Sequence, residues 1–166
     1  MKNTVSRTFL LCALLGIISA SWSATTTSTF SVTATIAPTC TVTVGSGAFG
    51  FGSIPNPINS NIDVNGQMQA TCSAGTPYAI AYSAGNGAGA TFAARKLTAG
   101  PNTLSYTFYT DPGRTTPWGD GTAGSSVVNG IGNGAVQQIP MFGRIPSGQN
   151  VPQGIYRDTV FVTLTF

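Results

Sequence analysis

The chain alternates apolar and polar residues with a period of two near both of its ends, as half-buried β-strands do. The apolar face of residues 29–36 consists of Phe30, Val32, Ala34 and Ile36. The apolar face of residues 156–166 consists of Val160, Val162, Leu164 and Phe166. Glutamate is absent, and apolar residues after position 24 do not recur at helical spacing. The pattern therefore predicts strands and no helices.

Short apolar or alternating runs predict the remaining strands. They lie at residues 40–44, 67–72, 78–83, 104–109 and 138–144. Segments rich in Gly, Pro, Asn and Asp separate them, at residues 45–61, 84–90 and 111–126. Several short strands joined by turn-rich loops are typical of an antiparallel β-sandwich. We expect an all-β fold of this kind.

The first 23 residues have the layout of a secretory signal peptide. Lys2 and Arg7 precede an apolar run at residues 9–18, and small residues follow, so we place cleavage within residues 20–24. The apolar run is about 10 residues long, whereas a membrane span needs ~20. A short N-terminal anchor is the alternative. Such a leader would direct the chain across the inner membrane and would then be removed.

The remaining charges are few and nearly balanced. Two of the seven Lys and Arg residues lie in the leader, and the other five are matched by four Asp residues. Such a chain offers no electrostatic footprint for nucleic acid. Histidine is absent, which removes the most common general base and metal ligand. The sequence therefore predicts no catalytic, cofactor-binding or metal-binding site, and we expect that the protein is not an enzyme.

Two cysteines, Cys40 and Cys72, remain once the leader with Cys12 is removed. In an exported chain an even pair indicates one disulfide. It would close a loop of about 32 residues, worth roughly 3–4 kcal/mol in the chain-entropy model. Two buried free thiols are the alternative.

Four polar or aromatic features could signal chemistry, but each favours a structural role. Asp111 and Asp120 could be a paired-carboxylate glycosidase site, yet both precede turn residues. Asp158 favours a structural hydrogen bond. Trp118 favours a packed loop anchor over a ligand-stacking aromatic. The G-x-G-x-x-G match at residues 45–50 favours a flexible turn, because glycine and prolines follow it.

The two alternating segments suggest how chains could join. A sandwich that ends on an apolar strand at Phe166 can lack its closing strand, and an unpaired edge beside an open core invites another strand. The N-terminal strand, set off by Pro38, could be a plug that one subunit gives to the next by β-strand addition. The alternative is that this strand folds back into its own domain, and the alternating pattern favours neither possibility over the other.

Several segments resemble the spore coat protein U domain. They are Cys40-Thr-Val, Cys72, Leu104-Ser-Tyr-Thr-Phe-Tyr-Thr-Asp111, Trp118-Gly-Asp-Gly121, Met141-Phe-Gly-Arg-Ile-Pro, Gln149, Pro152, Gly154, Tyr156, Asp158-Thr-Val and Val162-Thr-Leu-Thr-Phe166. Many members of that family are pilins of archaic, Csu-type chaperone–usher pili. The resemblance implies an incomplete immunoglobulin-like sandwich with an N-terminal donor strand, residues 24–37, and a pilin domain, residues 38–166.

The same resemblance implies partners and roles. A periplasmic chaperone would lend the missing strand, and an outer-membrane usher would exchange it for the donor strand of a neighbouring subunit. Phe30, Val32, Ala34 and Ile36 would be the donor plugs. The strand bordering the groove and binding the chaperone would be the one with Val160, Val162, Leu164 and Phe166.

Three functions therefore remain open. The first is a pilin of an extracellular fibre that supports adhesion and biofilm formation. The second is a spore-coat or surface-layer protein that uses the same domain without an usher. The third is a single-domain secreted adhesin or carbohydrate-binding module, which would depend on an accessible Trp118.

Overall fold

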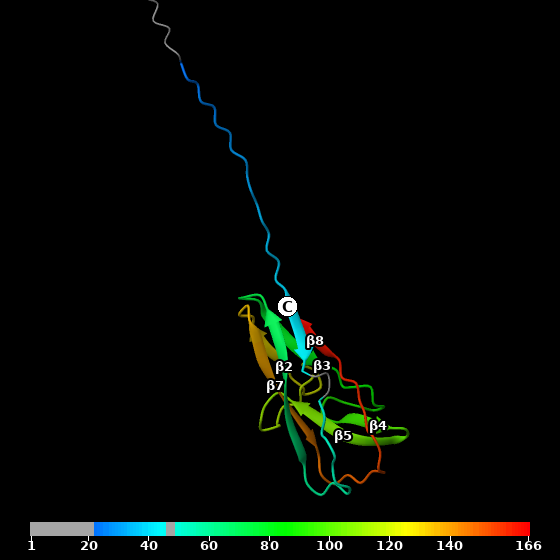
Figure 1. Cartoon of the computed structure of the whole chain (residues 1–166). Coiled ribbons are helices and arrows are strands. Elements are labelled where there is room, and N and C mark those ends of the chain that lie inside the picture. The colour runs from blue at the N-terminus through cyan, green and yellow to red at the C-terminus, as the bar shows by residue number, and fades with distance from the viewer. Residues whose placement is uncertain (1–21, 46–48) are drawn as a thin grey trace, which may run out of the picture. The chain divides into compact units, whose positions relative to one another are not determined.

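All regular secondary structure in the described part of the chain is β-strand. The computed structural model describes residues 22–45 and 49–166, so the predicted leader lies outside it except for residues 22 and 23. Residues 36–166 form one compact unit made of two antiparallel sheets (Figure 1). This arrangement agrees with the predicted antiparallel β-sandwich.

The larger sheet has five strands in the order β1-β2-β7-β5-β4. In that order they are β1 (Cys40–Val44), β2 (Ile62–Cys72), β7 (Val136–Ile145), β5 (Asn102–Tyr109) and β4 (Arg95–Ala99). The smaller sheet has the order β6-β3-β8, with β6 (Val128–Ile131), β3 (Pro77–Tyr82) and β8 (Val162–Thr165). Strands β1 and β4 are the edges of the larger sheet, and β6 and β8 are the edges of the smaller one.

Within residues 40–166 the predicted strands are largely confirmed, with four differences. Strand β2 begins at Ile62, whereas the sequence predicted a start at residue 67. Strands β4 and β6 were not predicted, because β4 begins with two cations and β6 is a four-residue run containing Asn-Gly. Strand β8 begins at Val162, later than predicted. The reason is that the backbone of Arg157 bonds Thr98 of β4, whereas that of Phe161 bonds Ser83 after β3. The chain therefore crosses between the two sheets before β8 begins.

The N-terminal segment has no strand in the single chain. Residues 22–39 form no regular structure, and the side chains of Phe30, Val32 and Ile36 are 85%, 81% and 94% exposed. A strand needs a neighbour for its backbone N–H and C=O groups. The strand predicted at residues 29–36 is thus not formed here, and its role as a donor stays a prediction.

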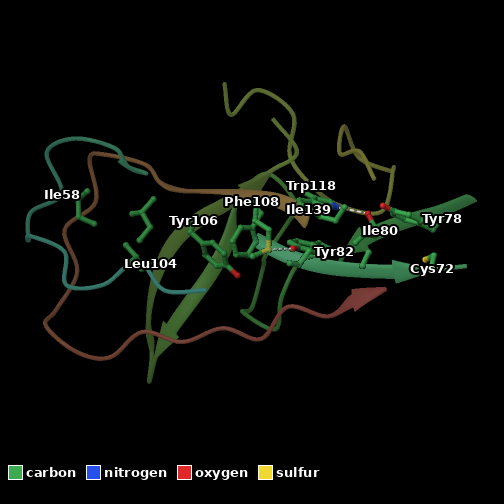
Figure 2. Packing of buried hydrophobic residues seen from close by; sticks show 14 residues of the cluster. Ile58, Cys72, Tyr78, Ile80, Tyr82, Leu104, Tyr106, Phe108, Trp118 and Ile139 are labelled. Carbon is green, nitrogen blue, oxygen red and sulfur yellow. Dashed lines mark hydrogen bonds between the residues drawn. The ribbon is translucent and has the colours of Figure 1, made fainter. Parts of the chain in front are cut away.

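The core lies between the sheets and is rich in aromatic rings. Figure 2 shows Tyr106 and Phe108 in the middle of this cluster, with Leu104 toward one end and Trp118 toward the other. The ring of Tyr82 stacks on Trp118 at 4.3 Å between centroids. Trp118 is fully buried, and its Nε1–H donates to the carbonyl of Ile80 at 2.9 Å. Trp118 is the packed anchor that its loop context predicted.

A buried arginine joins the loops at one end of the core. Arg95 is 0% exposed, and its guanidinium donates to the carbonyls of Ser83, Phe92 and Trp118 at distances of 2.6–3.0 Å. Burial lowers the pKa of Arg95 from its ordinary value. The carbonyls of three loop residues accept hydrogen bonds from this one cation. Arg95 therefore holds together segments that are distant in the sequence.

The predicted disulfide is confirmed. Cys40 and Cys72 face each other in the β1–β2 ladder, with their Cα atoms 4.1 Å apart, and the bridge spans 32 residues. It attaches the edge strand β1 to β2, its neighbour in the larger sheet. Because β1 has five residues and one neighbouring strand in its sheet, the bridge supplies much of its anchorage.

We expect Cys40→Ala/Cys72→Ala to lower the free energy of unfolding by about 3–4 kcal/mol, because the unfolded chain regains the entropy of the open loop. Urea unfolding followed by tryptophan fluorescence measures this loss. Wild-type protein kept in reductant is the control and should match the double variant. Equal midpoints for the oxidised wild type and the variant would contradict the prediction.

Candidate functional site: a groove beside an unpaired strand edge

Strand β8 presents an open edge. It pairs with β3 on one side and is the last strand of its sheet. The N–H of Ser83 donates to the carbonyl of Phe161, and by alternation Thr163 and Thr165 also bond toward β3. Val162 and Leu164 therefore direct their backbone N–H and C=O groups to the free edge. Such an edge is a template for another strand.

A groove lies beside the segment that leads to β8 and exposes part of the core, and β8 borders it at Val162. β1 and β8 lie side by side at the end that carries the disulfide (Figure 1). Beyond Val44 two adjoining hollows open, of about 610 and 480 Å³. Val44, residues 49–56 and Ile58 line one wall, and residues 151–160 with Val162 line the other. The floor is the hydrophobic core of the sandwich.

Phe49 and Phe51 line both hollows and were not identified from the sequence. The ring of Phe49 meets that of Phe108 edge-on at 4.8 Å. Two glycines make room for it, since a Cβ at Gly66 or Gly143 would come within 2.7 or 2.6 Å of this ring. The pattern Phe49-Gly-Phe51 in a glycine-rich loop is the one signal that could have indicated packed rings there.

Asp158 fixes the wall that leads to β8. Its carboxylate accepts the hydroxyl of Tyr106 at 2.7 Å and the backbone N–H of Asn86 at 2.8 Å. Burial, and then the bond to Asp158, raise the pKa of Tyr106 above its ordinary value, so the hydroxyl keeps its proton and donates it. Asp158 is therefore the structural hydrogen-bonding group that the sequence favoured.

The structure places the predicted groove residues in two environments. Val160, Val162 and Leu164 are half-buried and pack against the core. Phe166 follows the end of β8 and is 56% exposed. Together, the three half-buried side chains and the free backbone edge of β8 make this segment a surface that a strand could cover.

The carboxylates considered for chemistry are turn residues. Asp111 accepts the backbone N–H groups of Thr115 and Thr116, and Asp120 accepts that of Thr122. These bonds are the leading cause that lowers the pKa of Asp111.

Within residues 22–45 and 49–166, His, Cys, Asp and Glu form no group that could hold a metal ion. That same part of the chain contains no helix with the length and apolarity of a membrane span.

Residues 45–50, the glycine-rich match, lie partly outside the described residues. Gly50 lines the groove, together with its neighbours Phe49 and Phe51.

We expect Tyr106→Phe to lower the free energy of unfolding by roughly 1–3 kcal/mol, because it removes the hydroxyl that Asp158 accepts. Thermal unfolding measures the loss. Tyr109→Phe, on the outer face of the same strand, is the matched control and should unfold within about 0.5 kcal/mol of the wild type. If both variants unfold alike, Asp158 does not fix the wall.

Comparisons with known proteins agree with this architecture. A chain of the crystal structure of the CsuC–CsuE chaperone–tip adhesion subunit pre-assembly complex, from archaic chaperone–usher Csu pili of Acinetobacter baumannii, aligns with a TM-score of 0.58 and 22% identity. The alignment covers 80% of this chain and 40% of that one, and it shows a shared fold.

In sequence, the chain is 43% identical over 63 residues to Protein U of Myxococcus xanthus. The match covers 38% of this chain and 34% of Protein U, so only about a third of that relative's length is covered. The model of the Spore Coat Protein U domain matches residues 26–163. The chain therefore belongs to the Spore Coat Protein U domain family.

Proposed function

We propose that this protein is a pilin, a structural subunit of an extracellular chaperone–usher fibre assembled by donor-strand exchange. One observation carries the proposal: an apolar groove runs along the segment that leads to the edge strand β8 and ends at Val162, while residues 30–36 form an unpaired alternating segment with exposed apolar side chains. No strand covers the groove, and residues 30–36 pair with no sheet. Exchange of this segment between subunits would give the groove a covering strand and give the segment a sheet to pair with.

The energy of such an exchange is adequate. Burying Phe30, Val32 and Ile36 at ~1.5–3 kcal/mol each, with a smaller part from Ala34, gives roughly 5–9 kcal/mol before entropy costs. Backbone hydrogen bonds to the free edge of β8 add to this. Each subunit gives one surface and receives on another, so the contact is head-to-tail and does not close. The product is a filament.

The partners follow from the same geometry. A subunit with an open groove would aggregate, so a periplasmic chaperone would cover the groove in transit. An outer-membrane usher would exchange the chaperone for the donor segment of a neighbouring pilin. The disulfide suits an oxidising periplasm and cell surface. On the cell surface the fibre would serve adhesion and biofilm formation.

A second candidate is a coat or surface-layer protein with the same domain, and the identity to Protein U favours it. A chaperone gene and an usher gene beside this one would favour the pilin. The carbohydrate-binding alternative loses its basis, because Trp118 is fully buried and bonded.

The test compares three forms of the chain without its leader. The first lacks residues 24–37. The second is the same chain with residues 24–37 fused after Phe166 through a flexible linker. The third, the matched control, carries Val32→Asp and Ile36→Asp in the fused segment. We expect the fused form to be monomeric and more stable by several kcal/mol, because its groove is filled, and the control to resemble the truncated form.

Thermal unfolding and size-exclusion chromatography measure stability and assembly. If all three forms are equally stable monomers, the sandwich is complete without a donor and the pilin proposal fails.

A further inference from the structure

Two methionines remain in the chain once the predicted leader with Met1 is removed, and they differ in their position relative to the groove. Met141 of β7 lines the hollow of about 610 Å³. Met68 of the neighbouring strand β2 is 0% exposed, and it is not among the described residues that line either hollow. The same core therefore contains one methionine that borders the groove and one that is closed off from it.

The sulfur of Met141 has a defined hydrogen-bond partner in the floor of the groove. The hydroxyl of Tyr82, which lines the same hollow, donates to Sδ of Met141 at 2.7 Å (Figure 2). Burial raises the pKa of Tyr82 above its ordinary value, so the hydroxyl keeps the proton that it donates. A thioether sulfur has two lone pairs, and this bond uses one of them. The other lone pair remains available for reaction.

The hollow gives small molecules access to this sulfur. Its volume is about 610 Å³, whereas a water molecule occupies ~30 Å³ of the liquid, so the hollow has room for solvent. Hydrogen peroxide is little larger than water. Met141 is 3% exposed, and its unbranched side chain has three rotatable bonds, so small rotations bring the sulfur into contact with the hollow. Met68 has no such path through the groove.

We propose that Met141 is a site of reversible oxidation by peroxides, accessible while the groove is empty and protected once a strand fills it. The free lone pair of the sulfur attacks one peroxide oxygen, an S–O bond forms and the O–O bond breaks. The departing hydroxide takes the proton from the transferred oxygen and leaves as water. The sulfur loses two electrons, the peroxide gains them, and the product is methionine sulfoxide.

Oxidation changes what the groove can bind. The hydroxyl of Tyr82 can shift from the sulfur to the sulfoxide oxygen, but the side chains of Phe49, Phe108 and Val162, which line the same hollow, are apolar. An apolar strand laid over this floor would remove water from the sulfoxide, and burying a polar group with incomplete hydrogen bonding is unfavourable. The oxidised groove therefore binds such a strand more weakly. This consequence rests on the proposed function and adds regulation by peroxide to it.

The first test maps oxidation in the open chain, which is the full chain without its leader and with Val32→Asp and Ile36→Asp to keep its own segment out of the groove. Dilute hydrogen peroxide is the probe, and mass spectrometry follows the gain of one oxygen atom. Trypsin places the two methionines in different peptides, because Arg95 lies between them. We expect Met141 to be oxidised about tenfold faster than Met68, because susceptibility to oxidation follows exposure.

The second test measures the effect on binding, with a fluorescent peptide of residues 24–37 and anisotropy. We expect peroxide to weaken the binding of this peptide to the open chain about tenfold, because the sulfoxide loses water on burial, and methionine sulfoxide reductases to restore it. Met141→Leu keeps the volume of the side chain without its sulfur, so peroxide should leave the affinity of this variant unchanged. Met68→Leu is the matched control, and should respond to peroxide as the open chain does. In the fused form described above, the filled groove should slow oxidation of Met141 to the rate of Met68.

Equal oxidation rates of Met141 and Met68 in the open chain would overturn the site. An unchanged affinity for the peptide after Met141 has been oxidised would overturn the regulation. If the untreated open chain binds no peptide, and the fused form is no more stable than the truncated one, the proposed function fails and the regulation fails with it. The mass spectra of the open chain still decide the oxidation site in that case, because they need no occupant of the groove.

Discussion

The free backbone edge of β8 is the constraint on which the rest of the structure depends. Val162 and Leu164 direct their N–H and C=O groups away from β3, and Val162 lies at the end of a groove whose floor is the hydrophobic core. Polar backbone groups beside an apolar surface are best satisfied by another strand, which supplies hydrogen bonds and apolar side chains together. The segment at residues 30–36 has the alternation to supply both.

Because no strand lies between the walls of the open groove, other contacts must hold these walls in position. The disulfide anchors β1, and the bonds from Tyr106 and Asn86 to Asp158 hold the segment that leads to β8. Arg95 joins three loop carbonyls behind this wall. Covalent and polar contacts thus stabilise the places where apolar packing is incomplete.

Much of the fold was predictable because it depends on local pattern. The alternation and the turn-rich loops predicted six of the eight strands, and the even pair of cysteines in an exported chain predicted the bridge. Strands β4 and β6 were missed, since charged or short runs carry little periodicity. The packing of Phe49 and Phe51 into a groove wall, and the bonds from Tyr106 and Asn86 to Asp158, were not predicted, because these contacts form only when distant loops come together.

By itself, the sequence determined the β class, the disulfide, the turn roles of Asp111 and Asp120, and the amphipathic character of residues 30–36, because each follows from neighbouring residues or from the inferred compartment. The tertiary structure decided which strand edges stay unpaired, where the core is open, and which carbonyl Trp118 bonds. Those features depend on the order of strands in the sheets, and that order arises from contacts between residues far apart in the chain.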